Sequence, residues 1–366
     1  MTGIPRVRVS GTARERGLQY GEQARARVHR SVEAYREVFA HYAGWDWDTV
    51  RREAARFEAP VAAFGHRYLE EMRGIADGAG LGLADVLAIN VRTEIMFAAT
   101  VRKAAAGHPG ECSTFAVIPA SGATGPVLLG QNWDWLLHAA DTVVILEASQ
   151  DDGPGFVTVV EAGLLAKTGM NTAGLGLVTN ALVSSADVGE PGVPYHVLLR
   201  ALLDCTTVTG ALTRLQNCVR SSSANYLIAH SSGAVLNVEA APGDFSRLYP
   251  LSPGHDGVLL HTNHFLAPGA DPDGVSAWAM PDTLVRLQRL RASAAVGSRT
   301  LDGFRASLAD HADYPFGVCS HPDQAAHPQE QSATITSVLM DLTEGQMWLA
   351  AGNPCAEPYE MMWRAA

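Results

Sequence analysis

Lysine is almost missing from this sequence. Lys103 and Lys167 are its only two lysines, and its other cationic side chains are arginines. No run of basic residues occurs, and the formal net charge is −11, which argues against nucleic acid or an anionic membrane surface as a partner. The sequence also has no apolar run long enough to span a membrane, and its first residues lack the apolar core of a signal peptide. We therefore expect a cytoplasmic protein.

Cysteine is scarce as well. The five cysteines are Cys112, Cys205, Cys218, Cys319 and Cys355. An odd number without C-x-x-C spacing disfavours a disulfide framework and a zinc-ribbon site. We expect most of these thiols to be small buried apolar groups and at least one to be free. We expect no metal ion and no cofactor.

The remaining composition is that of an ordinary globular protein, with 47% of the 366 residues apolar and 18% charged. Before residue 110 the apolar residues recur at helical intervals, and after residue 112 short β-branched segments alternate with turn residues. The expected helices are 13–42, a second capped by 45–48, a third from Pro60 to 78–82, then 83–100, 195–203, 208–219, 282–292 and 301–308. The expected strands are 114–118, 127–130, 142–147, 157–161, 174–178, 226–229, 235–239, 258–261, 334–342 and 346–351. Residues 103–110 read as an exposed linker. Helices followed by many strands predict layers of sheet covered by helices.

Cys112 stands at the border between these two regions, at the start of an apolar strand-like run. A thiol becomes a good nucleophile only when a base takes its proton. One such base is a histidine, and another is the cysteine's own α-amine, whose pKa of about 7.7–8.0 lies near working pH. The second solution requires a cut between Glu111 and Cys112. On residue type alone, a buried core thiol is the more economical interpretation of Cys112.

Several short motifs accompany this cysteine along the chain. They are Arg92-Thr93-Glu94, Cys112-Ser113-Thr114, Gly130-Gln131-Asn132-Trp133-Asp134, Glu161-Ala162-Gly163, Gly169-Met170-Asn171-Thr172-Ala173-Gly174, Gly192-Val193-Pro194, His261-Thr262-Asn263-His264 and Asp313-Tyr314-Pro315-Phe316. In their order and spacing they resemble the acyl-coenzyme A:6-aminopenicillanic acid (isopenicillin N) acyltransferase family of N-terminal nucleophile hydrolases. The resemblance covers nearly the full length of the chain.

The resemblance implies an α+β fold, a four-layer αββα sandwich with a helical N-terminal segment. It implies autocatalytic cleavage into an α chain, 1–111, and a β chain, 112–366, which stay packed as one structural domain. The β chain is expected to form the catalytic sandwich.

Site roles follow from the same resemblance. Cys112 is the expected nucleophile, Asp134 the carboxylate beside its amine, and Asn263 the oxyanion stabiliser. Supporting roles fall to Thr114, Asn132 and His261. Asparagine donors of this kind lower an acyl-transfer barrier by roughly 2.7–4 kcal/mol. The expected partner is a small-molecule amide or acyl thioester, for which acyl-coenzyme A is one candidate.

The chain departs from the penicillin enzyme at three places. Glu111 replaces the glycine that precedes the nucleophile, which predicts slower or carboxylate-dependent cleavage. Glu330 and Gln331 replace a Ser-Arg pair, so recognition of a substrate carboxylate there is in question. Alanine in the run 240–242 replaces a serine. Penicillin itself is therefore not the predicted substrate.

Three other kinds of site are less consistent with these residues. A papain-like set of Cys112, His261 and Asn263 would need no cleavage, and we rank it lower. His261 and His264 lack a third metal ligand at standard spacing. The glycine-rich run 169–176 lacks the G-x-G-x-x-G pattern of nucleotide-binding loops.

Two further interpretations are structural. Glu161 and Lys167 are expected to form an ion pair or line a cleft, and Arg92-Thr93-Glu94 to tie the two halves of the chain together. Two alternative functions also stay open: an amidohydrolase related to the bile-salt and ceramide amidases, and a binding protein of the same fold that does not process itself.

Overall fold

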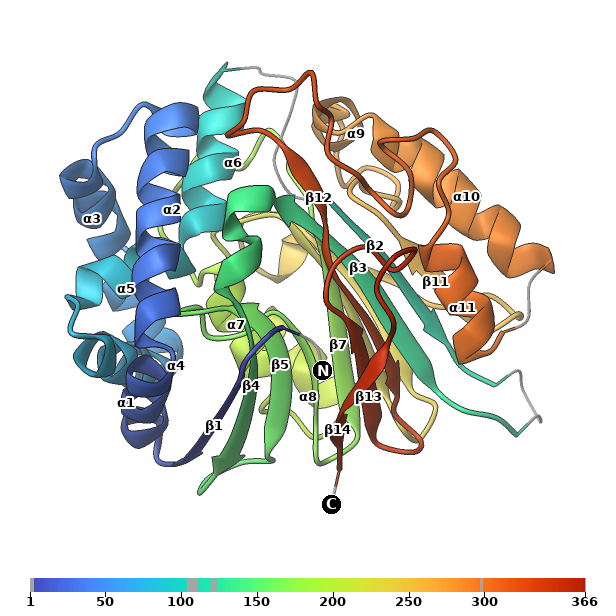
Figure 1. Ribbon diagram of the computed structural model, residues 1–366, viewed down its shortest axis with the longest axis horizontal. Helices are drawn as coiled ribbons and strands as arrows, with labels where there is room; N and C mark the ends of the chain where they lie inside the picture. Colours follow the sequence, from blue (N-terminus) through green and yellow to red (C-terminus); the bar gives the residue numbers. More distant parts are fainter. Residues whose placement is uncertain (1–2, 104–110, 120–123, 297–298, 366) are drawn as a thin grey trace.

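Two β-sheets face each other at the centre of the protein, and helices cover both outer faces (Figure 1). The computed structural model describes residues 3–103, 111–119, 124–296 and 299–365. Gln131 bridges the sheets, since its side-chain amide donates to the carbonyl of Thr179 at 2.8 Å. The α+β, αββα architecture predicted from the sequence is confirmed.

The larger sheet has eight strands in the order β1-β4-β5-β6-β7-β8-β9-β10. Their bounds are β1 (Arg6–Gly11), β4 (Val143–Gln150), β5 (Phe156–Glu161), β6 (Thr168–Asn171), β7 (Leu175–Ala181), β8 (Ala224–His230), β9 (Val235–Ala240) and β10 (Leu248–Leu251). β1 pairs in parallel with β4, whereas the other neighbouring pairs are antiparallel.

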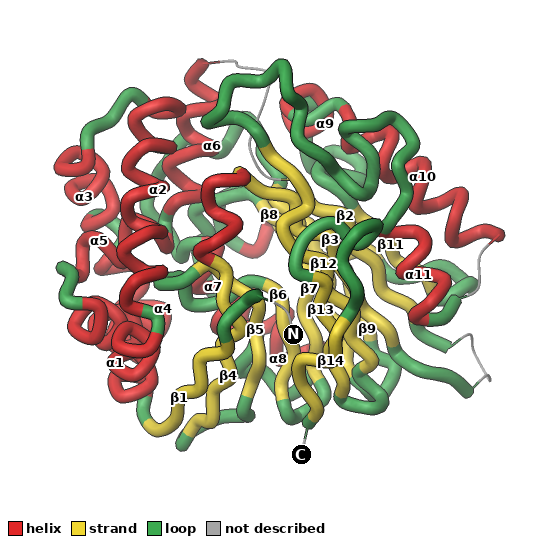
Figure 2. The backbone as a smooth tube through the Cα atoms, viewed as in Figure 1, coloured by secondary structure: helices red, strands yellow, loops and turns green. Residues whose placement is uncertain are grey.

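The smaller sheet has six strands in the order β11-β2-β3-β12-β13-β14, and all of these pairs are antiparallel. Their bounds are β2 (Glu111–Val117), β3 (Leu128–Leu136), β11 (Val258–His261), β12 (Ser332–Asp341), β13 (Gln346–Ala350) and β14 (Glu360–Arg364). Figure 2 shows the two groups of strands lying between the helical layers.

One outer layer comes mainly from the region before Cys112. It contains α1 (Ala13–Gln23), α2 (Arg25–Ala43), α3 (Trp47–Ala55), α4 (Glu58–Ala79), α5 (Leu83–Asn90) and α6 (Arg92–Lys103), together with α7 (Tyr195–Leu202) and α8 (Val208–Gln216). The smaller sheet is covered by α10 (Asp282–Val296) and α11 (Leu301–Leu308), with the short α9 (Val275–Ala279) nearby. In the described part of the chain no helix has the length and apolar character needed to cross a membrane.

Capping residues explain several helix ends. The Thr12 hydroxyl accepts from the Glu15 amide and the Glu15 carboxylate accepts from the Thr12 amide, a capping box at the start of α1. Asp46 caps the start of α3, as the sequence predicts. The predicted single helix over 13–42 is wrong, because the chain breaks at Ala24 into α1 and α2.

The first of these two helices, α1, packs closely against α4. A Cβ atom on Gly17 would lie 2.1 Å from the Glu71 carbonyl oxygen, so α1 and α4 cross in close contact.

Two strand predictions also fail in an informative way. The sequence predicts no strand before Cys112, yet β1 alternates buried Val7 and Val9 with exposed neighbours and extends the larger sheet. The strand predicted over 127–130 continues to Leu136, so the Asn132-Trp133-Asp134 motif lies inside β3. All nine residues of β3 are buried. Their residue types suggest a strand end, but the polar side chains of β3 lie inside the strand.

Candidate active site

Cys112 lies near the start of β2, between strands β11 and β3, with Trp133 opposite on β3. Its side chain is only 2% exposed. Burial raises the pKa of the Cys112 thiol, as does the nearby Asp134 carboxylate, while Lys167, Gln131 and Arg286 act in the opposite direction. Glu111 pairs with Asp134 across the same strands. The rest of the predicted linker, 104–110, lies outside the described residues, as does the side chain of Glu111.

Asn263 contacts the backbone nitrogen of the predicted cleavage site. Its Oδ1 accepts from the Cys112 amide at 2.8 Å and from Arg286 Nη2 at 3.0 Å, and its Nδ2 donates to the Ala181 carbonyl at 2.9 Å. Two donors on one side and a carbonyl on the other fix the orientation of this side-chain amide. In the uncleaved chain Asn263 thus accepts the N–H of the Glu111–Cys112 bond. Its role towards an oxyanion stays a prediction.

Arg286 is a site residue that sequence reasoning missed. This fully buried guanidinium on α10 donates to the Cys112 carbonyl at 3.1 Å and to Ser113 Oγ at 3.2 Å. It also donates to Asp282 Oδ2 at 2.6 Å. An arginine four residues after an aspartate on a helix looks like a solvated ion pair. The sequence therefore holds no local signal that this cation faces Cys112.

Asn180 was missed for a similar reason, because it is the last residue but one of the buried strand β7 and no motif surrounds it. Its Nδ2 donates to the Cys112 carbonyl at 2.8 Å, and its Oδ1 accepts from the Thr114 hydroxyl at 2.8 Å. The Thr114 hydroxyl therefore orients the Asn180 side chain, and its supporting role in catalysis stays a prediction. Together Asn180 and Arg286 place two donors on the carbonyl of Cys112.

Asp134 brings a carboxylate into the same interior region. Its Oδ1 accepts from the Thr334 hydroxyl, whereas its buried Oδ2 has no hydrogen-bond partner among the residues that the structure describes. Burial raises the pKa of Asp134 to about 7, against the opposing charge of Arg286. A buried acceptor without a donor is costly. The free oxygen suits a cationic donor such as an ammonium group.

Lys167 brings a second buried cation to the neighbourhood of the thiol. Its Nζ lies 4.7 Å from the centre of the Trp133 ring, and burial lowers its pKa. In the described part of the chain Glu161 pairs with Arg92 and forms no direct ion pair with Lys167, so the alternative that the two line a cleft stays a prediction. Glu161 accepts from Arg92 at 2.8 Å and from the Tyr35 hydroxyl at 2.6 Å.

His261 and Asn132 lie close to the site but face other groups. His261 Nε2 lies 2.7 Å from Glu239, and its Nδ1 lies 2.6 Å from the Thr262 carbonyl. Both ring nitrogens thus face acceptors, a geometry that does not support the papain-like arrangement. Asn132 donates to the carbonyls of Leu308 and Val318, both at 2.8 Å, so its support is structural.

The predicted ties between the two halves of the chain are confirmed. Besides the buried contact of Arg92 with Glu161, Glu94 accepts from the Tyr195 amide at 2.8 Å and from the hydroxyls of Ser221 and Ser222. Glu330, one of the two residues that replace the Ser-Arg pair, lies 2.9 Å from His41 on α2. That side chain thus contacts the helical layer.

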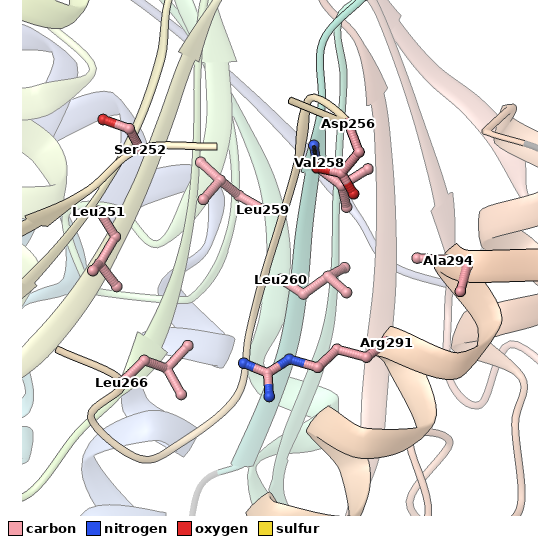
Figure 3. A pocket seen from close by; sticks show the side chains of 10 residues that line it. Leu251, Ser252, Asp256, Val258, Leu259, Leu260, Leu266, Arg291 and Ala294 are labelled. Carbon is pink, nitrogen blue, oxygen red and sulfur yellow. Dashed lines mark hydrogen bonds between the residues drawn. The ribbon is translucent and has the colours of Figure 1, made fainter. Parts of the chain in front are cut away.

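A cleft of about 400 Å³ opens beside β11 (Figure 3). Leu259 and Leu260 of β11 form part of its wall, and Arg291 of α10 reaches across it. Cys112, Asp134 and Asn263 are not among its lining residues. The cleft therefore neighbours the site without containing the thiol.

The profile of the family "Acyl-coenzyme A:6-aminopenicillanic acid acyl-transferase" matches residues 121–356. The 40 kDa form of acyl-coenzyme A:6-aminopenicillanic-acid-acyltransferase from Emericella nidulans is 23% identical over 348 residues, which are 95% of this chain and 92% of the relative.

Solved structures are similar at lower levels. An N-acylethanolamine-hydrolyzing acid amidase orthologue from Caenorhabditis elegans has a TM-score of 0.45 at 13% identity, covering 63% of this chain and 93% of its own. Penicillin V acylase from Agrobacterium tumefaciens has a TM-score of 0.43 at 17% identity, covering 68% and 85%.

The predicted family is thus confirmed, and with it the broader prediction of an enzyme that cleaves or transfers acyl groups at amide bonds. The profile covers more than half of the chain, including Asp134 and Asn263. We conclude that the chain belongs to the acyl-coenzyme A:6-aminopenicillanic acid acyl-transferase family.

Proposed function

We propose that this protein is a cysteine N-terminal nucleophile enzyme, which cuts its own chain between Glu111 and Cys112 and then uses the new N-terminus in catalysis. The observation that carries the proposal is the contact of the Cys112 amide nitrogen with Asn263 Oδ1 at 2.8 Å. An interior asparagine that holds this nitrogen, beside a buried thiol, has a clear chemical use at a scissile bond.

Self-cleavage is an acyl shift followed by hydrolysis. The Cys112 sulfur attacks the carbonyl carbon of Glu111, the C–N bond breaks, and the thiol proton passes to the departing nitrogen. Water then opens the resulting thioester, leaving a carboxylate on Glu111 and restoring the thiol. Asn263 and Arg286 position the Cys112 backbone, because they bind its nitrogen and its carbonyl respectively.

Catalysis repeats this chemistry on a small molecule. The α-amine of Cys112 takes the thiol proton, and the sulfur attacks the acyl carbon of an amide or thioester substrate. The leaving amine or thiol takes the proton, and an acyl thioester forms on Cys112. Water resolves it in hydrolysis, and an amine acceptor resolves it in acyl transfer.

Asp134 binds the α-amine of Cys112 in its protonated state. Its Oδ2, for which the described part of the chain offers no hydrogen-bond partner, lies in a buried site, where an ammonium would meet an ionised carboxylate. Such a charge-assisted hydrogen bond orients the amine and stabilises its charged form. The substrate is a small N-acylated amide, or an acyl thioester such as an acyl-coenzyme A. Gln331 offers no cation for a substrate carboxylate, so a penicillin-like nucleus is not proposed.

Intact mass spectrometry and a denaturing gel test self-cleavage. The purified protein should yield fragments 1–111 and 112–366, and Cys112→Ala should stay whole. Cys218→Ala is the matched control, since that half-buried thiol lies after α8 and should not affect cleavage. Arg286→Gln should slow cleavage by about 10- to 100-fold, as expected when a charged hydrogen-bond donor worth about 1.5–3 kcal/mol is lost.

An unsplit wild-type chain that still turns over amides would overturn the N-terminal amine scheme. To separate hydrolysis from transfer, the cleaved enzyme is given an acyl-coenzyme A with and without an amine acceptor. Acylated amine as the main product supports a transferase, whereas free acid at every acceptor concentration supports an amidohydrolase.

A further inference from the structure

Two cysteines and two histidines converge on one point at some distance along the chain from Cys112. They are His311, Cys319 and His321 in the loop after α11, and Cys355 in the loop after β13. One ligand atom from each residue lies within 4.8 Å of every other. Cys319 is buried, His321 is half-buried, and His311 and Cys355 reach the surface.

The separations fit a tetrahedral centre. His321 Nε2 lies 3.6 Å from the sulfur of Cys319 and 3.6 Å from that of Cys355. A zinc ion with Zn–S of about 2.3 Å and Zn–N of about 2.0–2.1 Å at tetrahedral angles sets a sulfur–nitrogen separation of about 3.6 Å. The two histidine Nε2 atoms are 3.1 Å apart, close to the roughly 3.4 Å expected between two nitrogen ligands.

The surroundings also suit bound thiolates. Asn353 Nδ2 donates to the Cys319 sulfur at 3.4 Å and to the Ser320 carbonyl at 2.7 Å. Hydrogen bonds of this kind orient metal ligands from outside the coordination sphere. Two thiolates also neutralise a divalent cation, and a tetrahedral S₂N₂ donor set favours zinc.

We propose that His311, Cys319, His321 and Cys355 form a structural zinc site that clamps the loop after α11 to the loop after β13. No metal was expected from the sequence, because the five cysteines lack C-x-x-C spacing. Cys355 lies 34 residues beyond His321, so these four ligands form no local motif. With four protein ligands the site is closed, so the zinc is structural and takes no part in the acyl chemistry.

The proposed zinc site lies next to Thr334, the residue that hydrogen-bonds to Asp134. Ser320 stands between two of the ligands, and its backbone exchanges hydrogen bonds with Thr334, each at 3.0 Å. The Thr334 hydroxyl in turn donates to Asp134. Zinc therefore fixes the loop that positions Thr334 beneath the catalytic carboxylate.

Elemental analysis tests the proposal. The full chain, purified under reducing conditions and dialysed against metal-free buffer, should carry a single zinc ion by inductively coupled plasma mass spectrometry. Cys355→Ser and His311→Gln change exposed side chains and should lower zinc content at least tenfold, and Cys218→Ser should retain it. Apoprotein loaded with Co²⁺ should show the thiolate and ligand-field absorption bands of a tetrahedral site, which Cys355→Ser removes.

Three outcomes overturn the proposal. One is a wild-type chain that holds no zinc and takes up none when Zn²⁺ is added. Another is equal zinc in both ligand variants and the wild type, with circular dichroism showing that all are folded. The last is a Cys319–Cys355 disulfide in the protein as purified.

Discussion

The buried Asp134 carboxylate should make the stability of the uncut chain depend on pH. The substitution is Asp134→Asn in a Cys112→Ala background, so that every chain stays uncut. Burial raises the pKa of Asp134 from its ordinary value of 3.8 to about 7. Ionising this group in the folded chain therefore costs about 4 kcal/mol more than in the unfolded chain.

The direction in which pH changes the stability follows from proton binding by the folded and unfolded states. Between about pH 4 and pH 7 the folded state holds the Asp134 proton and the unfolded state does not, so raising the pH favours unfolding. Over this window the free energy of unfolding falls by about 1.4 kcal/mol per pH unit from this group alone. Asparagine cannot ionise, so its contribution does not change with pH. The free energy of unfolding of Asp134→Asn, relative to that of its parent, should therefore rise by roughly 2–3 kcal/mol between pH 5 and pH 7.

Urea unfolding followed by tryptophan fluorescence measures this difference at each pH. Asp151→Asn, in the exposed turn after β4, is the matched control for the effect of an aspartate-to-asparagine substitution at the surface. A constant offset between Asp134→Asn and its parent would refute the reasoning, since it would mean that Asp134 ionises alike in the folded and unfolded chains. In the cleaved enzyme Asp134→Asn should lower turnover while leaving the protein folded, because the α-amine loses its anionic partner.

Two further predictions concern buried contacts. Arg92→Met leaves Glu161 without its cation in the core and should lower the free energy of unfolding by about 3–5 kcal/mol. In urea unfolding, the double variant Arg92→Met with Glu161→Gln should recover much of this loss. Strictly additive losses in the double variant would contradict the prediction. His261→Gln should self-cleave within tenfold of the wild-type rate on a time-resolved gel, because the ring faces Glu239 rather than Cys112; complete loss of cleavage in a folded variant would return His261 to the mechanism.

Motifs along the chain were enough to predict the family, the layered fold and the meeting of Cys112 with Asn263. They carry this information because a short run such as His-Thr-Asn-His identifies a position in the fold. Arg286 and Asn180 have no such run around them. Their importance arises only when α10 and β7 are brought beside β2, and that arrangement depends on packing across the whole protein.

β1 was missed and β3 was cut short because the alternation of buried and exposed side chains gives little signal in either strand. β1 has only six residues, a length at which alternation of buried and exposed side chains is a weak signal. β3 is buried on both faces, so it shows no alternation at all. The cluster around Cys319 and Cys355 is likewise invisible in sequence, because antiparallel pairing of β12 with β13 is what returns the chain to the first ligands.

The pairing of β1 with β4 gives the proposed cut a lasting consequence. Once the Glu111–Cys112 bond is broken, a strand of one polypeptide forms part of a sheet that belongs otherwise to the second. Unfolding then releases two molecules, and recovery depends on their collision and so on protein concentration. The intact precursor avoids this dependence, because its linkage keeps the two parts at a high effective concentration. The mature enzyme would therefore stay folded because it unfolds slowly, since in dilute solution its two separated chains would not refold together.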